Sequence, residues 1–195
     1  MASLPKPYYE PAEYLTLERA AAYKSEYLAG EIFAMAGASE EHNTITLNIA
    51  SELRIQLRGS PCRAYANDMR VKVQASGLYT YPDVVAVCGE RRFEDGHRDT
   101  LLNPTVIFEV LSPSTEGYDR GKKFALYRGL ESLQEYLLVA QDEARVEHYI
   151  RHDHDWVLRD VADTIQFAAI AAVLPLAAVY ENVALPPSAA DAAPA

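Results

Sequence analysis

Two segments of almost continuous apolar residues, 81–88 and 105–111, constrain the fold of this chain more than any other feature of its sequence. Each has the length of a β-strand, and apolar side chains occupy positions on both of its alternating faces. Strands of this kind lie in the middle of a sheet that is covered on both sides. The sequence therefore predicts a layered fold in which these two segments are central strands.

Each of the two segments also carries one carboxylate. Asp83 opens the apolar part of the first segment, and Glu109 lies inside the second. A buried carboxylate is costly to ionise unless a cation or a hydrogen-bond donor compensates its charge. Hard divalent cations prefer carboxylate and carbonyl oxygens, so Asp83, Glu109 and the main-chain carbonyl of Val110 form a candidate site for Mg²⁺, with Mn²⁺ as an alternative.

A lysine on the following helix is the candidate for charge stabilisation. Hydrolysis of a phosphodiester needs positive charge near the negative charge that develops on the phosphate. A strand lysine two residues after the metal-binding glutamate commonly supplies it. Here Leu111 occupies that position after Glu109. Asp119, Lys123 and Tyr127 share one helix face. Lys122 points roughly 100° away from that face, so we expect Lys123 to approach the carboxylates. As a lysine in a cleft, it should contribute little to stability.

The remaining pattern predicts a single domain with helices and strands. A chain of 195 residues is long enough to bury a full core. We expect a flexible arm over residues 1–11, the domain over 12–183, and a disordered Ala/Pro tail over 184–195. Ser39 is the expected N-cap of the second helix. The expected helices cover 12–23, 40–58, 117–129 and 174–180, and the expected strands cover 31–36, 63–75, 81–88, 104–111, 135–140, 145–150 and 156–159.

The net charge of −10 counts against a nucleic-acid partner, because proteins that bind nucleic acids usually present a basic surface. Bound metal ions would neutralise the part of this acidity that lies at the metal site. The helix predicted over 117–129 carries four basic side chains, and the local charge matters more than the total when a phosphate is attracted. We therefore expect weak or transient binding of DNA.

No segment of the sequence predicts a membrane helix. Nowhere do about 18 apolar residues follow one another without interruption, and the first residues contain no apolar stretch typical of a secretion signal. Cys62 and Cys88 are too few for a disulfide framework or a zinc cluster. We expect a cytoplasmic protein in which Cys88 is a buried thiol.

Several segments, taken in their order along the chain, resemble the Uma-type family of restriction endonucleases, within the PD-(D/E)XK nuclease superfamily. These segments are 24–32, 35–43, 81–85 and 109–115, followed by Asp119, Lys123 and Tyr127. The resemblance extends from about Tyr14 to Tyr180. It implies a restriction-endonuclease-like α/β (α+β) fold, with a mixed central β-sheet flanked by helices.

The same resemblance implies a role for four residues. Asp83 and Glu109 would be the metal ligands, and Lys123 would be an active-site lysine displaced from the strand to the helix. Glu26 would be the acid that such nucleases place on the first helix beside the metal. Leu111 departs from the superfamily pattern, so the role of Lys123 depends on whether its ammonium reaches the site.

The metal-site interpretation competes with simpler structural ones. Asp83 follows a proline and could cap the start of its strand, as acidic residues in turns often do. Lys123 could be a solvated helix residue paired with Asp119. Glu109 is harder to explain without a function, because a carboxylate inside an apolar strand carries a desolvation cost.

Structural interpretations also exist for Glu26, for His42 and for three histidines near residue 150. Glu26 could pair with Lys24 or face water, and His42 could be a polar residue near a helix N-terminus without any role as a ligand. The three histidines flank two aspartates in an expected hairpin loop, where a metal site is the weaker interpretation. They are His148, His152 and His154.

These observations favour a cytoplasmic, Mg²⁺-dependent endonuclease that acts on DNA. A homodimer is expected by analogy, since two sites conveniently cut two strands. One alternative is a catalytically inactive binding module that keeps the nuclease fold, and another is a metal-dependent hydrolase of a small phosphate compound. A basic groove leading to Asp83 would favour DNA, whereas a closed acidic pocket would favour the small substrate.

Overall fold

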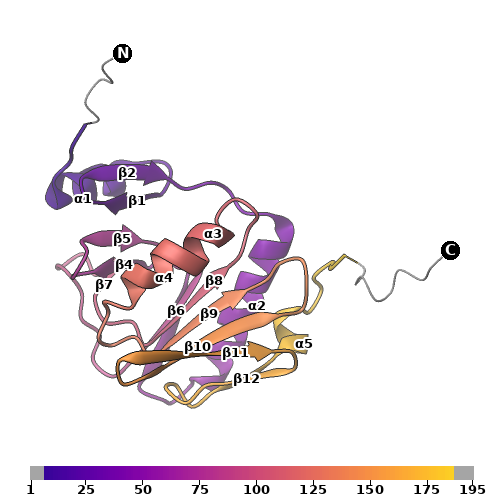
Figure 1. Ribbon diagram of the computed structural model, residues 1–195. Helices are drawn as coiled ribbons and strands as arrows, with labels where there is room; N and C mark the ends of the chain where they lie inside the picture. Colours follow the sequence, from indigo (N-terminus) through magenta and orange to yellow (C-terminus); the bar gives the residue numbers. More distant parts are fainter. Residues whose placement is uncertain (1–6, 187–195) are drawn as a thin grey trace.

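The structure is a computed structural model that describes residues 7–186, and its strands form three sheets (Figure 1). The six-stranded sheet has the order β11-β10-β9-β8-β6-β3, the five-stranded sheet has the order β2-β1-β5-β4-β7, and β12 pairs with β13. The strands are β1 (Ser25–Leu28), β2 (Glu31–Ala34), β3 (Cys62–Ala66), β4 (Arg70–Val73), β5 (Leu78–Thr80), β6 (Val84–Cys88), β7 (Thr100–Leu101), β8 (Val106–Val110), β9 (Glu135–Val139), β10 (Val146–His152), β11 (Asp155–Val161), β12 (Thr164–Gln166) and β13 (Val173–Pro175).

The two apolar segments form neighbouring strands inside the six-stranded sheet, as predicted. β6 and β8 pair antiparallel with Val84 opposite Phe108, while β8 and β9 pair parallel, so the sheet is mixed. All five residues of β8 are buried, and so are four of the five in β6. The fold class is therefore confirmed as α+β, with mixed sheets flanked by helices. The helices are α1 (Pro11–Ala20), α2 (Glu40–Gln56), α3 (Glu116–Tyr118), the π-helical turn η1 (Asp119–Lys123), α4 (Phe124–Tyr127) and α5 (Leu176–Val179).

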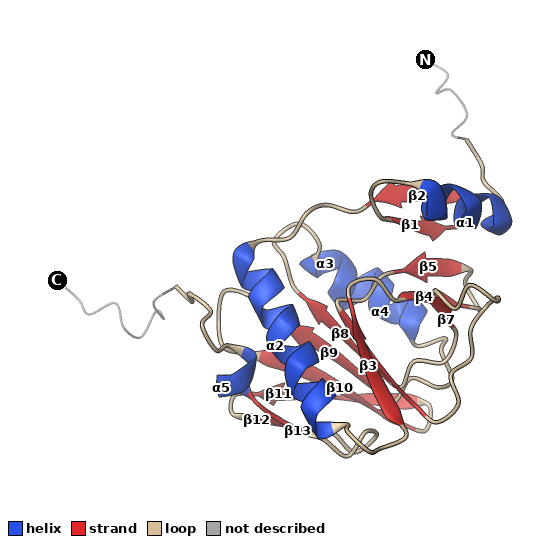
Figure 2. Cartoon of the chain, turned by 180° about the vertical axis from the view of Figure 1, so that it is seen from behind, coloured by secondary structure: helices blue, strands red, loops and turns tan. Residues whose placement is uncertain are grey.

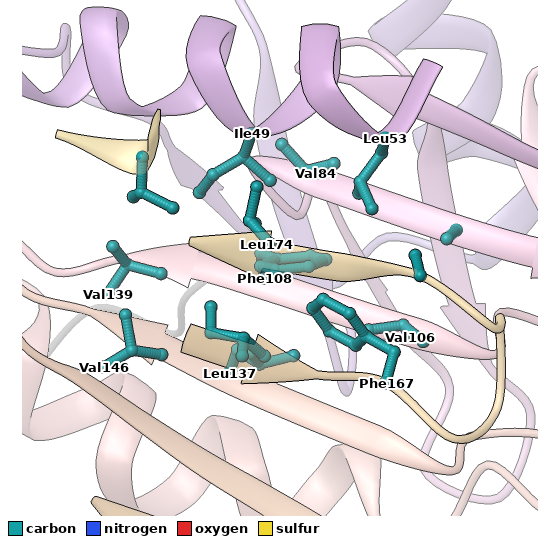
Figure 3. Close-up of a cluster of buried hydrophobic side chains, with 14 of the residues drawn as sticks. Ile49, Leu53, Val84, Val106, Phe108, Leu137, Val139, Val146, Phe167 and Leu174 are labelled. Carbon is teal, nitrogen blue, oxygen red and sulfur yellow. The ribbon is translucent and has the colours of Figure 1, made fainter. Parts of the chain in front are cut away.

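Helix α2 covers one face of the six-stranded sheet, as Figure 2 shows. It begins after Ser39, whose Oγ accepts a hydrogen bond from the backbone N–H of His42 at 3.1 Å, so the predicted N-cap is confirmed. Ile45, Ile49 and Leu53 lie on its inner face and pack in one apolar cluster with the sheet residues drawn in Figure 3. Burying one such side chain contributes about 1.5–3 kcal/mol.

The opposite face of this sheet packs against the segment formed by α3, η1 and α4. A second apolar cluster lies there, and it includes Val85, Ile107 and Tyr127. Because side chains alternate along a strand, Phe108 and Val110 point toward α2, whereas Glu109 points toward the helical segment that carries Lys123. The fold thus directs Glu109 toward the predicted lysine.

A buried polar network fixes the strand that carries Glu26. The carboxylate of Glu18, in α1, accepts hydrogen bonds from the backbone N–H and the hydroxyl of Ser25 in β1, and from the hydroxyl of Tyr81 at 2.8 Å. The buried guanidinium of Arg70 donates to the same Tyr81 hydroxyl at 2.9 Å. Networks with all partners satisfied hold a unique arrangement, so this one sets the position of β1 against the five-stranded sheet.

Some sequence-based boundaries were wrong, for local reasons. The strand predicted over 63–75 is two strands of different sheets, because the chain turns at Asn67, which has a positive φ of 59° that asparagine tolerates better than most residues. Four strands of two to three residues (β5, β7, β12 and β13) are too short to give a periodic signal. The closing helix predicted over 174–180 is limited to α5, since residues 173–175 form β13.

The ends of the chain fall partly outside the described residues. Residues 1–6 of the predicted arm and 187–195 of the predicted tail are among those not described. The described part of the arm contacts the domain, because the backbone N–H of Tyr9 donates to the carbonyl of Gly30 at 3.0 Å. The boundaries at 11 and 183 therefore stay predictions.

The two cysteines form a disulfide bond, so the expectation of a free buried thiol at Cys88 was wrong. Cys62 and Cys88 lie directly opposite each other on the antiparallel strands β3 and β6, which brings their sulfurs together. The expectation of a reducing compartment relied on free thiols and loses that support. Within residues 7–186, no helix is long and apolar enough to span a bilayer.

Candidate active site

Asp83 and Glu109 lie next to each other on the paired strands. Since Val84 is opposite Phe108, the next position along the ladder places Asp83 opposite Glu109. The Oδ2 atom of Asp83 accepts a hydrogen bond from the backbone N–H of Val110 at 2.8 Å. Glu109 is almost completely buried, with 4% of its surface exposed. The two carboxylates that were predicted to act together therefore share one end of the sheet.

Lys123 brings a positive charge into this cluster. Its Nζ lies 3.0 Å from Oε1 of Glu109, 3.2 Å from Oε1 of Glu26 and 3.5 Å from Oδ1 of Asp119. The side chain of Lys123 is 6% exposed, whereas Lys122 faces solvent. Lys123, and not Lys122, is therefore the lysine that reaches the carboxylates. The expectation of a lysine exposed in a cleft was wrong, because its side chain is buried among three carboxylates, and its contribution to stability stays a prediction.

The backbone around Lys123 is a π-helical turn, and not the regular α-helix predicted over 117–129. Asp119 and Lys123 begin and end this turn, and both side chains are buried. Such turns are rare and are frequently found at functional sites. The wider turn still places both residues on the inner side of the segment, where the predicted i, i+4 pair forms.

Hydroxyl groups from three further elements hold two of the carboxylates and the backbone at Asp119 in place. Tyr127 in α4 donates to Oε1 of Glu109 at 2.7 Å, and Thr80 in β5 donates to Oε1 of Glu26. Tyr136 in β9 donates to the backbone carbonyl of Asp119 at 3.1 Å. The site therefore lies where the two large sheets and the helical segment meet.

Glu26 belongs to a strand, which corrects its predicted place on the first helix. It lies in β1, opposite Phe33 of β2, and β1 is bonded on its other side to β5. The sequence before it, with Lys24 and Ser25, gave no clear signal for a strand of only four residues. The residue itself is at the site that was predicted, but it reaches Lys123 from the five-stranded sheet.

Burial and mutual repulsion control the charges of the cluster. Burial raises the pKa of Glu109 well above its ordinary value, Lys123 opposes this shift, and Asp119 and Asp83 add to it. Burial likewise raises the pKa of Asp119. Burial favours the neutral amine of Lys123, but Glu109, Glu26 and Asp119 outweigh it and raise its pKa. Lys123 therefore stays protonated in the presence of surplus negative charge.

The donor set fits a hard divalent cation in chemistry. The site combines the carboxylates of Asp83, Glu109, Asp119 and Glu26 with one ammonium, so a further cation would balance charge that Lys123 alone does not. As the side chains stand, no three His, Cys, Asp or Glu residues within 7–186 are arranged to hold a metal ion. The predicted set of Asp83, Glu109 and the Val110 carbonyl includes only two such side chains, and it stays a prediction.

His42 also reaches the site, although its sequence context suggested only a polar residue near a helix N-terminus. Its Nε2 lies 3.3 Å from Oδ2 of Asp83, and its Nδ1 is buried without a hydrogen-bond partner. Burial lowers the pKa of His42, but Asp83 outweighs this effect, with help from the Val110 carbonyl and Asp119, so the net shift is upward. The one sequence signal was its place in the segment 35–43 that carries the family resemblance.

The contact between His42 and Asp83 gives a testable pH effect. In the parent protein, we expect the His42 imidazole to titrate above its ordinary value of 6.5, because Asp83 stabilises the imidazolium. In Asp83→Asn, burial should dominate and move the titration downward by about one unit or more. NMR titration of the ring protons measures both, with the exposed His154 as a reference signal. An unchanged His42 titration would show that the contact does not form in solution.

The three histidines near residue 150, where a metal site was the weaker interpretation, lie outside the carboxylate–lysine cluster. His148 is buried and contacts Glu135 at 2.6 Å, while His152 and His154 are exposed near the β10–β11 turn, so these histidines do not come together. The basic helix is partly neutralised, since Arg120 pairs with Glu147. The local positive charge of this helical segment is therefore smaller than its sequence suggested.

Comparisons with known proteins found one family model and two relatives that match in sequence. The family model "Uma2: Putative restriction endonuclease" matches residues 11–179. Two uncharacterized proteins of Synechocystis sp. (strain ATCC 27184 / PCC 6803 / Kazusa) are similar in sequence. The protein sll1609 is 41% identical over 151 residues, which are 77% of this chain and 85% of that protein. The protein slr1290 is 33% identical over 185 residues, which are 93% and 96%.

A crystal structure supports the same fold. It is that of a "putative nuclease belonging to DUF820" from Anabaena variabilis ATCC 29413, and it superposes with a TM-score of 0.71. The match covers 87% of this chain and 96% of the other, at 20% sequence identity. At this identity, the similarity shows that the two chains share a fold.

Proposed function

We propose, on the premise that this chain belongs to the Uma2 family of restriction endonucleases, that it is a nuclease that hydrolyses phosphodiester bonds in DNA with the help of Mg²⁺ or Mn²⁺. One observation carries the proposal. The buried ammonium of Lys123 lies within 3.0 Å of Glu109, beside Asp83 and two further carboxylates. Such a cluster is costly to bury, and buried clusters of titratable groups with shifted pKa values concentrate at functional sites.

Each residue of the cluster has a separate role in this proposal. Asp83, Glu109 and the carbonyl of Val110 would hold the divalent cation. When bound, that cation would activate a water molecule and stabilise negative charge on the phosphate. The protonated Lys123 would stabilise the charge that develops on the phosphoryl oxygens. Glu26 and Asp119 act as positioning residues, because their contacts orient the ammonium of Lys123.

The limited exposure of the site supports a second candidate. The side chains of Glu109, Asp119 and Lys123 are each 5–6% exposed, and the less buried members, Asp83 and Glu26, are 17% and 14% exposed. A closed acidic site favours a small substrate over a polymer. Metal-dependent hydrolysis of a small phosphate compound is therefore the alternative, and family membership favours DNA over it.

A cleavage assay with matched variants tests the proposed function. Supercoiled plasmid should be cut in Mg²⁺ or Mn²⁺, and Asp83→Asn should slow cleavage about 10²–10³-fold, as removal of an electrostatic contact in an active site does. The asparagine can still accept the hydrogen bond from the Val110 N–H. Glu116→Gln, which changes the charge equally at an exposed position of α3, is the control and should cleave at the parental rate.

The alternative is tested in the same assay with a small phosphodiester. A parent protein that hydrolyses bis(p-nitrophenyl) phosphate but neither plasmid nor oligonucleotide would replace DNA with a small substrate. A parent protein inactive toward all of these with either metal ion would favour a binding module.

Two subunits would cut both strands of one duplex, so a dimer should appear in analytical ultracentrifugation when DNA is present.

A further inference from the structure

A basic pocket lies at the end of α2 that is remote from the candidate active site. Its volume is about 280 Å³, and Arg54, Arg58 and Arg63 line it together with Gly59 and Cys62. Arg54 is in the last turn of α2, Arg58 follows the helix, and Arg63 is in β3. Three arginines around one pocket are unexpected in a chain with a net charge of −10.

The charges of these three arginines are not balanced by acidic partners. None of them forms an ion pair within the described part of the chain, in contrast to Arg19, which pairs with two aspartates. Arg63 is held in place, because its Nη1 donates to the carbonyls of Ser60 at 3.0 Å and Cys62 at 2.7 Å. The carbonyl end of α2 carries roughly half a negative charge, which three guanidinium groups exceed. The pocket therefore attracts an anion.

Two elements connect this pocket with the candidate active site. Helix α2 starts beside Asp83, where His42 lies, and reaches Arg54 after a rise of about 18 Å at 1.5 Å per residue. The edge strand β3 returns from Cys62 to Ala66, and the next residue, Asn67, donates its N–H to the carbonyl of Asp83 at 2.9 Å. A bound duplex would cover such a distance with about five base pairs.

We propose that this arginine pocket (Arg54, Arg58 and Arg63) binds a backbone phosphate of the nucleic acid that the candidate active site cleaves. Guanidinium groups suit this ligand, because they can donate two parallel hydrogen bonds to phosphate oxygens. The proposal deepens the proposed function and rests on it. It also supplies basic surface that the total charge of the chain and Arg120, which pairs with Glu147, do not provide.

Binding without cleavage tests the pocket. The affinity for a labelled duplex long enough to span both sites is measured by fluorescence anisotropy in EDTA, at several salt concentrations. Arg54→Glu and Arg58→Glu should each weaken binding about tenfold at low salt, and each should reduce the slope of log affinity against log salt by about one. Both side chains are exposed, so these variants should fold, which melting curves verify.

The control is Arg159→Glu, the same charge change at an exposed position of β11, at the opposite edge of the six-stranded sheet. It should bind like the parent. If the pocket variants bind no more weakly than this control, the proposal is wrong. Thermal stabilisation of the parent by inorganic phosphate, lost in Arg58→Glu, without any binding of the duplex, would overturn nucleic acid as the ligand.

The binding and cleavage assays separate the two proposals. Duplex binding that depends on Arg58, in a protein that cuts no plasmid, would support the pocket and contradict the proposed nuclease activity. Plasmid cleavage by the parent, with duplex binding that is unaffected in both pocket variants, would support the nuclease and overturn the pocket. The two failures therefore give different results.

Discussion

Replacing Lys123 with Met is expected to lower the free energy of unfolding by about 3–5 kcal/mol at neutral pH, because it removes one partner from a buried ionic cluster. Glu109, Glu26 and Asp119 each lie within 3.0–3.5 Å of the ammonium. Without it, buried negative charges face one another with no compensating cation. Methionine keeps a similar length and apolar stem, so the packing changes little.

The size of this loss should depend on pH. In the parent, the pKa of Glu109 and the pKa of Asp119 are already raised above their ordinary values of 4.5 and 3.8. A carboxylate with a higher pKa in the folded state destabilises the fold increasingly as the pH rises from its ordinary value toward the raised one. Removing the ammonium raises both pKa values further, so the variant should recover stability as the pH falls from about 7 to about 5.

Urea-induced unfolding at both pH values measures the effect. Lys122→Met is the matched control, because Lys122 is the adjacent residue and is exposed, and it should change the free energy of unfolding by less than about 0.5 kcal/mol. Equal stability of the two variants at neutral pH would mean that the carboxylates surrounding Lys123 are protonated or solvated in solution.

The sequence predicted those parts of the fold whose signals are local and strong. β6 and β8 follow from continuous apolar segments, and α2 follows from the spacing of Ile45, Ile49 and Leu53 after a serine cap. The division between β3 and β4 was missed, because it depends on the left-handed conformation of Asn67 and on the sheet that each strand joins. Pairing between distant segments leaves no periodic pattern in the sequence.

The candidate site was predicted only in part, because some of its residues carry a local signal in the sequence and others do not. Asp83 and Glu109 stand out because they interrupt apolar segments, and Lys123 stands out because it shares a helix face with Asp119 and Tyr127. The structure brings Asp83, Glu109 and Lys123 together. The strand location of Glu26 and the approach of His42 could not be deduced, since both depend on how separate elements pack. The burial of Lys123 was missed as well, because helix periodicity does not show which sheet covers a face.

Glu109→Gln is expected to abolish metal-dependent cleavage, with a loss of at least about 10³-fold. Glutamine removes the negative charge that would bind the cation, and with it the ability of the cation to activate a water molecule. The amide has the same shape as the carboxylate, so its oxygen can still accept the hydrogen bond from Tyr127. Initial cleavage rates in Mg²⁺ measure the loss, with Glu131→Gln as an exposed control.

The same substitution should raise the stability of the metal-free protein, which separates a catalytic role from a structural one. The raised pKa of Glu109 means that the folded state disfavours its charged form, so a neutral side chain removes a cost that is largest at high pH. Lys123 keeps Glu26 and Asp119 as partners. We expect a gain of about 1 kcal/mol near pH 8 in EDTA, which is roughly 2–4 °C in melting temperature. If Glu109→Gln cleaves at the parental rate, the chemistry lies elsewhere. If it melts at a lower temperature than the parent, Glu109 serves mainly as the structural partner of Lys123.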